Sequence, residues 1–300
     1  MEIIAGTTDF YLEKETAVAI GKFDGVHIGH RRLLEEILSQ KRSGLAACVF
    51  TFDPAPSVLF GRSDGRELTT REEKRVLFER MGIDILVEFP LTMETAAMEP
   101  ECFVREILAE RMNTRFLAAG TDLSFGAGGR GNASLLESLS PQLEFCVKII
   151  GKVCVDGKEV SSSLIRNQVE QGDMPYAGRL LGMPYPIMGS VVHGNRIGRT
   201  LGFPTINLLP PPDKLLPPNG VYLSDVTCGG RKYHAISNVG CKPTVTEELV
   251  MGVETYLYDF DGELYGEFVE IYLKEFKRPE RKFDSLEALK EQLAQDIKIM

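Results

Sequence analysis

Two histidines three residues apart form the segment of this sequence best suited to chemistry. His27 and His30 follow an apolar, strand-like run at residues 17–20 and a Gly/Asp turn, and they open an amphipathic helix pattern. Side chains at i and i+3 share one face of a helix, and a helix N-terminus offers free N–H groups and partial positive charge. We therefore expect the pair to bind a polyphosphate. The alternative is a histidine pair that only caps the helix.

The full string GKFDGVHIGH favours a phosphate-binding loop over a simple cap. Its glycines, its aspartate and its two histidines fall where such a loop needs them. Gly29 has no Cβ, which lets the backbone approach a ligand closely. We expect His27 and His30 to be catalytic, and the binding residues of the loop to be Gly21, Phe23, Asp24 and Gly29.

A run of three serines and an arginine opens another predicted helix, at residues 162–171. Hydroxyls and backbone N–H groups at a helix start, with an arginine one turn further on, form an anion site. Alone the pattern is a common helix cap. Its place after the histidines in one α/β unit resembles the second phosphate clamp of nucleotidylyltransferases. The residues concerned are Ser161, Ser162, Ser163 and Arg166.

The segment 120–132 contains G-x-G-x-x-G at Gly126, Gly128 and Gly131. It does not fit a dinucleotide-binding fingerprint, because residues 121–125 separate the first glycine from the preceding strand. A ligand-binding loop with Asp122 near the strand end fits the sequence better.

The segment GNRIGRTLGFPTIN, residues 194–207, marks the second half of the chain. Its glycines permit a tight loop over phosphates, and Thr205 and Asn207 are hard oxygen donors two residues apart. In a strand, residues i and i+2 face the same side, so both can reach one Mg²⁺ ion. By itself, PTIN is also a turn that enters a strand. We expect ligand contacts from Gly194, Gly198, Arg199, Thr205 and Asn207, which the family resemblance described below would make contacts to ATP or flavin.

Glu254 lies in a run that alternates with apolar residues, next to Val253 and near Tyr256 and Tyr258. A carboxylate in such a position is either on the solvated face of a strand or a positioned general base. The alternation alone favours the solvated face.

Composition excludes several classes of protein. The 43 acidic and 34 basic residues give a net charge of −9, which argues against a general nucleic-acid-binding surface. The N-terminal segment lacks the features of a signal peptide, and no apolar stretch reaches the roughly 18 residues that span a bilayer. We expect a cytoplasmic protein with small-molecule substrates. The six scattered cysteines indicate reduced core residues, without the clustering of a zinc site.

The first part of the chain alternates strand and helix patterns, which predicts an α/β fold with a mostly parallel sheet and helices on both faces. Ligands on such sheets bind beyond the carboxyl ends of the strands. The predicted helices are 30–42, 70–81, 99–112, 132–139 and 162–171. The predicted strands are 17–20, 45–52, 85–89, 115–120, 143–150 and 152–155.

The pattern changes after about residue 182, and residues 183–277 are rich in proline, glycine and β-formers. Short strands with turn signals predict an antiparallel barrel or sandwich. The tail predicts a terminal helix packed on it, with a cap at Asp284 and Ser285 and a stripe from Leu286 to Ile297. We expect domains at residues 1–182 and 183–300.

Taken in order, these motifs resemble the bacterial bifunctional riboflavin kinase/FMN adenylyltransferase family, also called FAD synthetases. The first half carries GKFDGVHIGH, TFDPAP, AGTDLSFG and SSSLIR, and the second carries GRTLGFPTIN, PPNGVY, SNVGCKPTV and VETYLYDFDGELYG. The resemblance covers essentially the whole chain. It implies a Rossmann-like nucleotidyltransferase domain followed by a six-stranded riboflavin kinase barrel.

The resemblance also implies two ATP-dependent reactions. The second half would make FMN and ADP from riboflavin, and the first half would join FMN to AMP from ATP and release pyrophosphate. His27 and His30 would stabilise the ATP phosphates, with Asp122, the serine run and Arg166 lining the same site. Thr205 and Asn207 would hold Mg-ATP, and Glu254 would act as the base for the ribityl 5′-hydroxyl, which reverses the preference from alternation.

The sequence departs from the family pattern at four positions. Ala55 stands where the family usually has a phosphate-contacting histidine, Leu123 replaces an aromatic residue, Ile206 replaces alanine and Lys242 replaces arginine. Ala55 bears most on the adenylyltransferase. The rival functions are a kinase-only protein and a flavin-binding or flavin-sensing module without turnover. The intact histidine pair, serine run, PTIN and Glu254 argue against both.

Overall fold

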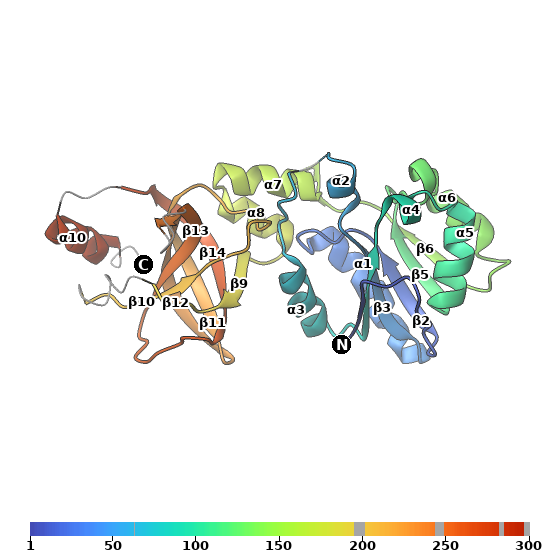
Figure 1. The fold of residues 1–300 in the computed structure, drawn as a ribbon, viewed down its shortest axis with the longest axis horizontal. Coiled ribbons are helices and arrows are strands. Elements are labelled where there is room, and N and C mark those ends of the chain that lie inside the picture. Colours follow the sequence, from blue (N-terminus) through green and yellow to red (C-terminus); the bar gives the residue numbers. More distant parts are fainter. Residues whose placement is uncertain (63, 195–201, 244–248, 282–284, 297–300) are drawn as a thin grey trace. The chain divides into compact units, whose positions relative to one another are not determined.

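The computed structural model describes residues 1–62, 64–194, 202–243, 249–281 and 285–296. These residues form two compact units (Figure 1). The N-terminal unit comprises residues 1–66 and 74–161, and the C-terminal unit comprises residues 67–73 and the chain from residue 162 onward. The units divide the chain at other positions than residue 182, and the expected domain boundary there stays a prediction.

A six-stranded parallel sheet forms the centre of the N-terminal unit, as predicted. The strand order is β1-β4-β3-β2-β5-β6, and each neighbouring pair is parallel. The edge strand β1 had no counterpart in the sequence prediction. The strands are β1 (Glu2–Ala5), β2 (Thr16–Ile20), β3 (Ala46–Asp53), β4 (Ile85–Pro90), β5 (Thr114–Gly120) and β6 (Cys146–Ile150).

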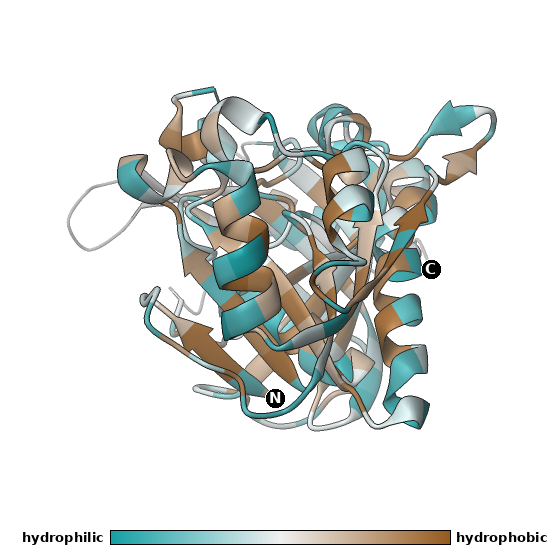
Figure 2. Ribbon diagram, turned by 90° about the vertical axis from the view of Figure 1, so that its right-hand side faces the viewer, coloured by the Kyte–Doolittle hydropathy of each residue, from teal (hydrophilic) through white to brown (hydrophobic). Residues whose placement is uncertain are grey.

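Helices cover both faces of this sheet, which explains why its central strands read as continuous apolar runs. The π-helix η2 (Phe103–Arg111) and α6 (Ala133–Leu139) pack in one core cluster with Val18, Phe50 and Leu117. Helix α1 (Ile28–Ser39) contacts β2, β3 and β5, and its buried residues lie outside that cluster, so it covers the other face. In Figure 2, hydrophilic and hydrophobic residues alternate along the helix ribbons, as in amphipathic helices.

All five helices predicted for the first part of the chain are confirmed. Helix α3 is Arg71–Met81, α7 is Ser162–Gln171 and α8, which the prediction missed, is Met174–Leu181. None of the helices in the described part of the chain is long and apolar enough to cross a membrane. The short helices are η1 (Gln40–Ser43), α2 (Pro56–Leu59), α4 (Met93–Ala96), α5 (Pro100–Cys102) and η3 (Ala127–Gly129).

Two sequence predictions for this unit are wrong. The run at 152–155 is no strand of the main sheet. Instead β7 (Cys154–Val155) pairs with β8 (Lys158–Glu159) in a hairpin, and Asp156 and Gly157 both have positive φ, as an Asp-Gly hairpin turn requires. The prediction of core cysteines is wrong for most of them in both units, because only Cys48 is buried, Cys228 is half-buried and the other four are exposed; all six are free thiols.

The C-terminal unit is built on a curled antiparallel sheet of six strands in the order β10-β13-β12-β11-β14-β9. The two edges meet where Val192, just after β9, donates its N–H to the carbonyl of Asn207, which confirms the predicted six-stranded barrel. The strands are β9 (Tyr185–Ser190), β10 (Thr205–Leu208), β11 (Gly220–Cys228), β12 (Arg231–Pro243), β13 (Leu249–Leu257) and β14 (Phe268–Pro279).

The terminal helix is confirmed as α10 (Leu286–Asp296). The hydroxyl of Ser285 accepts the N–H of Ala288 at 3.1 Å, and Arg278 on β14 forms a bidentate pair with buried Asp296 at 2.9 and 2.5 Å. The helix is therefore tied to the barrel by its last residue. Asp284 and Ile297 of the predicted cap and stripe lie outside the described residues.

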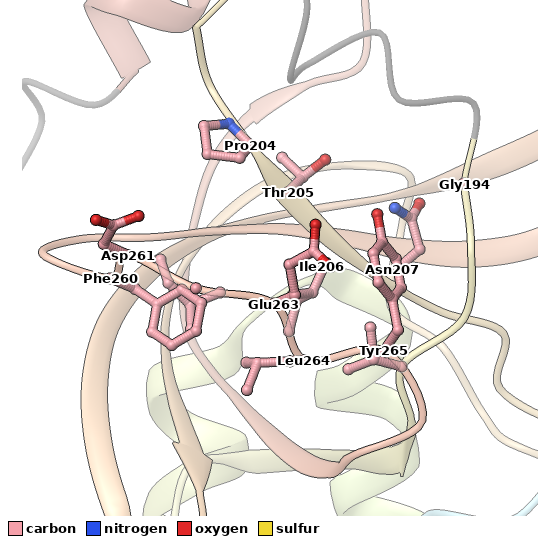
Figure 3. Close-up of a pocket in the computed structure, with 13 residues that line it drawn as sticks. Gly194, Pro204, Thr205, Ile206, Asn207, Phe260, Asp261, Glu263, Leu264 and Tyr265 are labelled. Carbon is pink, nitrogen blue, oxygen red and sulfur yellow. The ribbon is translucent and has the colours of Figure 1, made fainter.

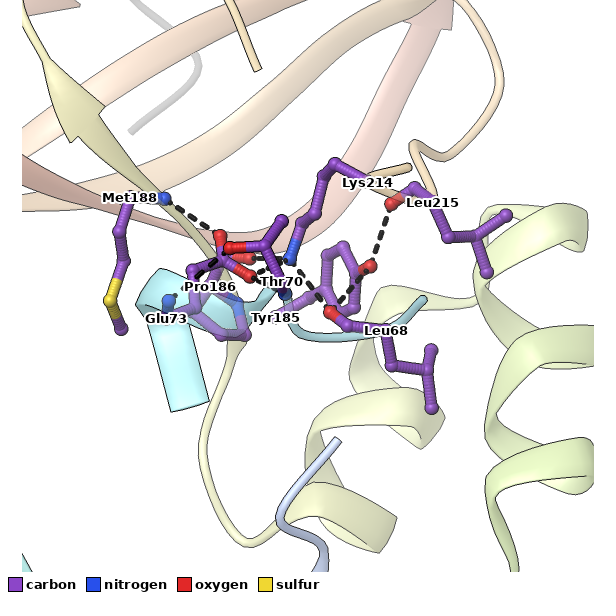
Figure 4. A network of polar contacts seen from close by, with 8 residues as sticks. All are labelled: Leu68, Thr70, Glu73, Tyr185, Pro186, Met188, Lys214 and Leu215. Atoms are coloured by element: carbon purple, nitrogen blue, oxygen red, sulfur yellow. Dashed lines mark hydrogen bonds and ion pairs between the residues drawn. The ribbon is translucent and has the colours of Figure 1, made fainter. Parts of the chain in front are cut away.

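Lys214 is a fully buried cation of the C-terminal unit (Figure 4). Its Nζ lies 2.6 Å from the carboxylate of Glu73 and donates to the carbonyls of Leu68 and Pro186, both at 2.7 Å. The ammonium also lies 4.5 Å from the centre of the Tyr185 ring. Burying a charge is costly unless it is paired and hydrogen-bonded, and these contacts meet that requirement.

Glu73 is equally well satisfied. Its carboxylate accepts the N–H of Met188 on β9 and the N–H of Thr70, each at 2.9 Å, while the Thr70 hydroxyl accepts the N–H of Glu73. The second and third of these bonds form a capping box at the start of α3. The Tyr185 hydroxyl lies within hydrogen-bond distance of the carbonyls of Leu68 and Leu215. The segment 67–73, from the first half of the sequence, is thus part of the C-terminal unit.

We predict that Glu73→Gln strongly destabilises the C-terminal unit, because it keeps the shape of the side chain but leaves the buried ammonium without its counter-charge. Breaking a buried pair in this way typically costs about 3–5 kcal/mol. Urea-dependent hydrogen exchange of barrel peptides measures the loss. Glu72→Gln, one residue away and exposed, is the control. Equal unfolding midpoints for the two variants would contradict this account. A fragment of residues 183–300 lacks Glu73 and should be less stable for the same reason.

Candidate active sites

The histidine loop leaves the sheet between β2 and α1. Strand β2 is wholly buried, and the chain then makes a tight turn in which Phe23, Gly25 and Val26 have φ values of 52°, 83° and 42°. Positive φ at a β-branched residue such as Val26 is rare and is often found at functional sites. The Phe23 ring is buried between His30 and Phe78, with centroid distances of 5.2 and 5.7 Å. Packing therefore holds the loop in this conformation.

His27 and His30 lie together, as their spacing predicts. Their rings stack with a centroid distance of 3.6 Å and an interplanar angle of 16°. His27 is the N-cap of α1, and its Nδ1 accepts the N–H of His30 at 3.2 Å. That bond places the ring proton of neutral His27 on Nε2, which remains a donor. The helix cap and a ligand-binding role thus use different nitrogens of one ring.

Both imidazoles are neutral near pH 7. Burial lowers the pKa of His27 to about 4, and this outweighs the opposite effects of Asp24 and Asp122. Burial also holds the pKa of His30 well below its usual value, with further lowering by His27 and Lys74. His30 Nδ1 is buried and has no hydrogen-bond partner within the described part of the chain. Such an unsatisfied group is a candidate ligand contact.

Asp122 faces the same edge of the sheet as the histidines. Strands β2 and β5 are adjacent and parallel, and the strand order changes direction between them, which is where open α/β sheets bind ligands. Asp122 follows β5 and is close enough to His27 to affect its pKa. Lys152, which follows β6 and which sequence reasoning missed, lies 3.9 Å from Asp122 and 2.8 Å from Glu159. The carboxyl edge therefore carries both signs of charge.

The glycines near this edge serve local packing. A Cβ at Gly29 would lie 3.1 Å from the His27 ring, so this glycine makes room for the imidazole. A Cβ at Gly21 would similarly meet the Phe23 ring at 3.2 Å. Gly126 packs on Pro100 and Gly131 on the Phe125 ring, which explains the G-x-G-x-x-G pattern without a dinucleotide. Direct ligand contacts of Gly21 and Gly29 stay predictions.

The serine run does begin a helix. Ser161 is the last residue of the N-terminal unit, and Ser162, Ser163 and Arg166 lie in the first turns of α7, which belongs to the C-terminal unit. The expected phosphate clamp combines these residues with the histidines. It stays a prediction.

The predicted kinase residues come together on neighbouring strands of the barrel. Thr205 and Asn207 lie on β10, and Glu254 lies opposite Asn207 on β13. The Thr205 hydroxyl donates to Glu254 Oε1 at 2.7 Å. Glu254 alternates with buried Val253 and Thr255, so it lies on the other face of β13 from these core residues. It is half-buried and hydrogen-bonded, and so differs from a freely solvated carboxylate.

A cavity of about 320 Å³ adjoins this cluster (Figure 3). Thr205 and Asn207 line it, and Gly194 lies so close to Asn207 that a Cβ there would be 2.6 Å from the amide nitrogen. Glu254 is not among the lining residues. It is connected to the cavity wall by its hydrogen bond with Thr205, which does line the cavity. Gly198 and Arg199 lie outside the described residues. The cavity therefore carries the expected threonine and asparagine donors at its wall.

Sequence reasoning missed the loop that forms the other wall of the cavity. Phe260, Asp261, Glu263 and Tyr265 line it, and the Tyr265 ring packs on His193 with a centroid distance of 3.9 Å. The available signal was the Asp-Gly turn flanked by aromatic residues in DFDGELYG. These side chains give the cavity aromatic surface and two carboxylates.

The departures from the family pattern occupy ordinary positions. Ala55 is the N-cap of α2 without a side-chain cap bond, just beyond the carboxyl end of β3. Leu123 packs against the core cluster, and Ile206 is buried on β10. The side chain of Lys242 lies outside the described part of the structure.

Comparisons with known proteins cover both units. The FAD synthetase family model matches residues 11–164, and the riboflavin kinase family model matches residues 181–300. A crystal structure of a Streptococcus pneumoniae protein, described as a macrolide-efflux protein, has a TM-score of 0.84 and 30% identity, and covers 99% of this chain and 97% of that one.

Two curated relatives match along their lengths. The bifunctional riboflavin kinase/FMN adenylyltransferase of Listeria monocytogenes is 35% identical and covers 97% of this chain and 93% of that protein. The protein of the same name from Buchnera aphidicola is 34% identical and covers 100% and 98%. With family matches in both halves and relatives of this identity over the whole length, the chain belongs to the bifunctional riboflavin kinase/FMN adenylyltransferase family.

Proposed function

We propose that the C-terminal unit phosphorylates riboflavin to FMN at the Thr205–Glu254 cluster, and that the histidine loop of the N-terminal unit transfers AMP from ATP to FMN to give FAD and pyrophosphate. The 2.7 Å hydrogen bond between Thr205 and Glu254, at the wall of the cavity, carries the first assignment. The stacked, neutral histidine pair carries the second.

In the kinase reaction, Glu254 is the general base. The Thr205 hydroxyl orients the Glu254 carboxylate, which takes the proton of the ribityl 5′-hydroxyl as its oxygen attacks the γ-phosphorus and ADP leaves. Direct transfer needs no covalent intermediate on the protein. Most of the catalysis would come from positioning and charge stabilisation.

The donors on β10 fit Mg²⁺. Thr205 and Asn207 present hydroxyl and amide oxygens on one side of a strand, and Mg²⁺ prefers a few hard oxygen ligands together with water and substrate phosphates. When bound, the ion would neutralise charge on the phosphates. Within the described residues, no group of three or more His, Cys, Asp or Glu side chains forms a metal site, so the phosphates would supply part of the coordination.

In the adenylyl transfer, the FMN phosphate attacks the α-phosphorus of ATP and pyrophosphate leaves. His27 offers its Nε2–H as a hydrogen-bond donor to the phosphates, next to the free N–H groups of α1. Asp122 faces the same sheet edge, and Ser161, Ser162, Ser163 and Arg166 would complete the phosphate contacts. Neutral histidines would bind pyrophosphate less tightly than charged ones, which suits its release.

One incubation separates this function from its rivals. Riboflavin and Mg-ATP are supplied, and the flavins are separated by chromatography. We expect FAD. Accumulation of FMN alone would indicate a kinase with an inactive first half, and unchanged riboflavin would indicate a binding module.

We predict that the two activities separate at the histidine loop. His27→Asn keeps a side chain that can cap α1 but removes the Nε2–H donor. Combined with His30→Ala, it should lower FAD formation from FMN by at least about tenfold, the value of one lost charge-assisted hydrogen bond. FMN formation from riboflavin should stay within about twofold. Loss of both activities in a folded variant would contradict two separate sites.

Glu254→Gln should lower FMN formation by roughly 10²- to 10⁴-fold, because the amide keeps the contact with Thr205 but cannot take a proton. FMN supplied directly should still become FAD. Glu267→Gln, an exposed carboxylate on the same barrel, is the control. A loss of less than about tenfold would reject Glu254 as the base.

Ala55→His should raise FAD formation from FMN and Mg-ATP. A histidine beyond the end of β3 would add a charge-assisted hydrogen bond to a phosphate, worth roughly 1.5–3 kcal/mol, or about 10- to 100-fold in rate. Kinase activity in the same preparation is the control. An unchanged or lower rate in a stable variant would show that position 55 does not limit this site.

A further inference from the structure

A half-buried asparagine, Asn238, lies next to Glu254 and has no role in the reactions above. The strand register pairs Glu254 on β13 with Asn207 on β10 and with Asn238 on β12. Cross-strand partners point to the same face of a sheet and their Cβ atoms are close. The three side chains therefore form one row, with the carboxylate in the middle.

Glu280 fixes the orientation of the Asn238 amide. Asn238 Nδ2 donates to Glu280 Oε1 at 3.1 Å, and the Glu280 carboxylate lies against Gly240, where a Cβ would clash with it. Glu280 follows β14, which lies on the opposite side of β12 from β13. The donor end of the amide is thus directed away from the strand that carries Glu254.

The acceptor end is left without a partner. Asn238 Oδ1 is buried and makes no hydrogen bond with any part of the chain that the structure describes. The residue as a whole is only half-buried, so it is not sealed in the barrel core. Buried polar atoms without partners are rare in native proteins, and a functional role is one of their recognised causes.

We propose that Asn238 Oδ1 accepts a hydrogen bond from a secondary hydroxyl of the ribityl chain of riboflavin, and so selects a polyhydroxylated substrate. The inference rests on the proposed kinase function, which brings the 5′-hydroxyl to Glu254. Adjacent strands lie about 4.8 Å apart, a step that a short polyol chain spans between nearby hydroxyls.

Deoxy analogues of riboflavin test this assignment. A site built to hydrogen-bond a substrate hydroxyl rejects the analogue that lacks it. For one of the two analogues, 4′-deoxyriboflavin or 3′-deoxyriboflavin, the wild-type chain should have a kcat/KM of phosphorylation roughly 10- to 100-fold lower than for riboflavin. In Asn238→Ala the rate with riboflavin should fall by a similar factor, and the preference over that analogue should shrink to about threefold or less.

Three controls make the result decisive. Asn219→Ala, an exposed asparagine on the same barrel, should leave the preference unchanged. Asn238→Leu keeps the shape of the side chain and replaces the alanine variant if that fails to fold, as judged by thermal unfolding. Glu254→Gln tests the underlying function separately.

An unchanged preference in folded Asn238 variants would overturn the proposal, and so would a wild-type chain indifferent to both analogues. If Glu254→Gln still abolishes phosphorylation in that case, the kinase assignment stands without Asn238. If neither residue affects phosphorylation, the proposed site itself is wrong.

Discussion

The buried ammonium group of Lys214 organises the C-terminal unit. An unpaired cation in this position would be strongly destabilising, so every part of the chain that supplies a partner must be in place. Those partners come from two distant segments, Leu68 and Glu73 at the start of α3 and Pro186 on β9. The barrel is therefore complete only with residues that the sequence order would assign to the other half. The same contacts fix β9, whose far end leads to the bridge that closes the barrel at Asn207.

Both candidate sites rely on groups that are fixed before any substrate arrives. At the sheet edge, packing on Phe23 and the helix cap hold two neutral imidazoles in a stack. In the barrel, Thr205 holds one oxygen of Glu254. In each case the protein itself presents little net charge. Neutralisation of the negative charge on the phosphates is left to the cation that accompanies them. Short strands and a helix start are enough to position these groups.

Much of this arrangement follows from local sequence patterns. The strand, turn and helix around His27 and His30, and the shared side of Thr205 and Asn207, come from spacing alone and are confirmed. The hydrogen bond between Thr205 and Glu254 was beyond such patterns, because it depends on the register of strands far apart in the chain. The assignment of these residues to particular ligands came from the family resemblance and stays a proposal.

Other features were missed, some because their causes are not local and some because a local signal was outweighed. The segment 67–73 shows only a helix cap in the sequence, Thr70 with Glu73, and nothing marks it as a partner of Lys214. The run at 152–155 is apolar enough for a sheet strand, yet the Asp-Gly pair that follows it turns it into a hairpin. That signal was present and was outweighed by the apolar composition. The cavity loop at 260–265 carried a local turn signal, but nothing local shows that it lies opposite Thr205 and Asn207.

The helix cap formed by His27 gives this protein a defined weakness in acid. In the neutral state, His27 Nδ1 accepts a hydrogen bond from the N–H of His30. Protonation places a hydrogen on Nδ1, so that two donors face each other and the bond is lost. The unfolded chain takes up this proton near pH 6.5, whereas the folded chain resists it until about pH 4. Free energy of unfolding is therefore lost as the pH falls through this interval. Acid thus removes the cap at the start of α1 and with it the contact that orients the imidazole, although Nε2–H itself remains a donor.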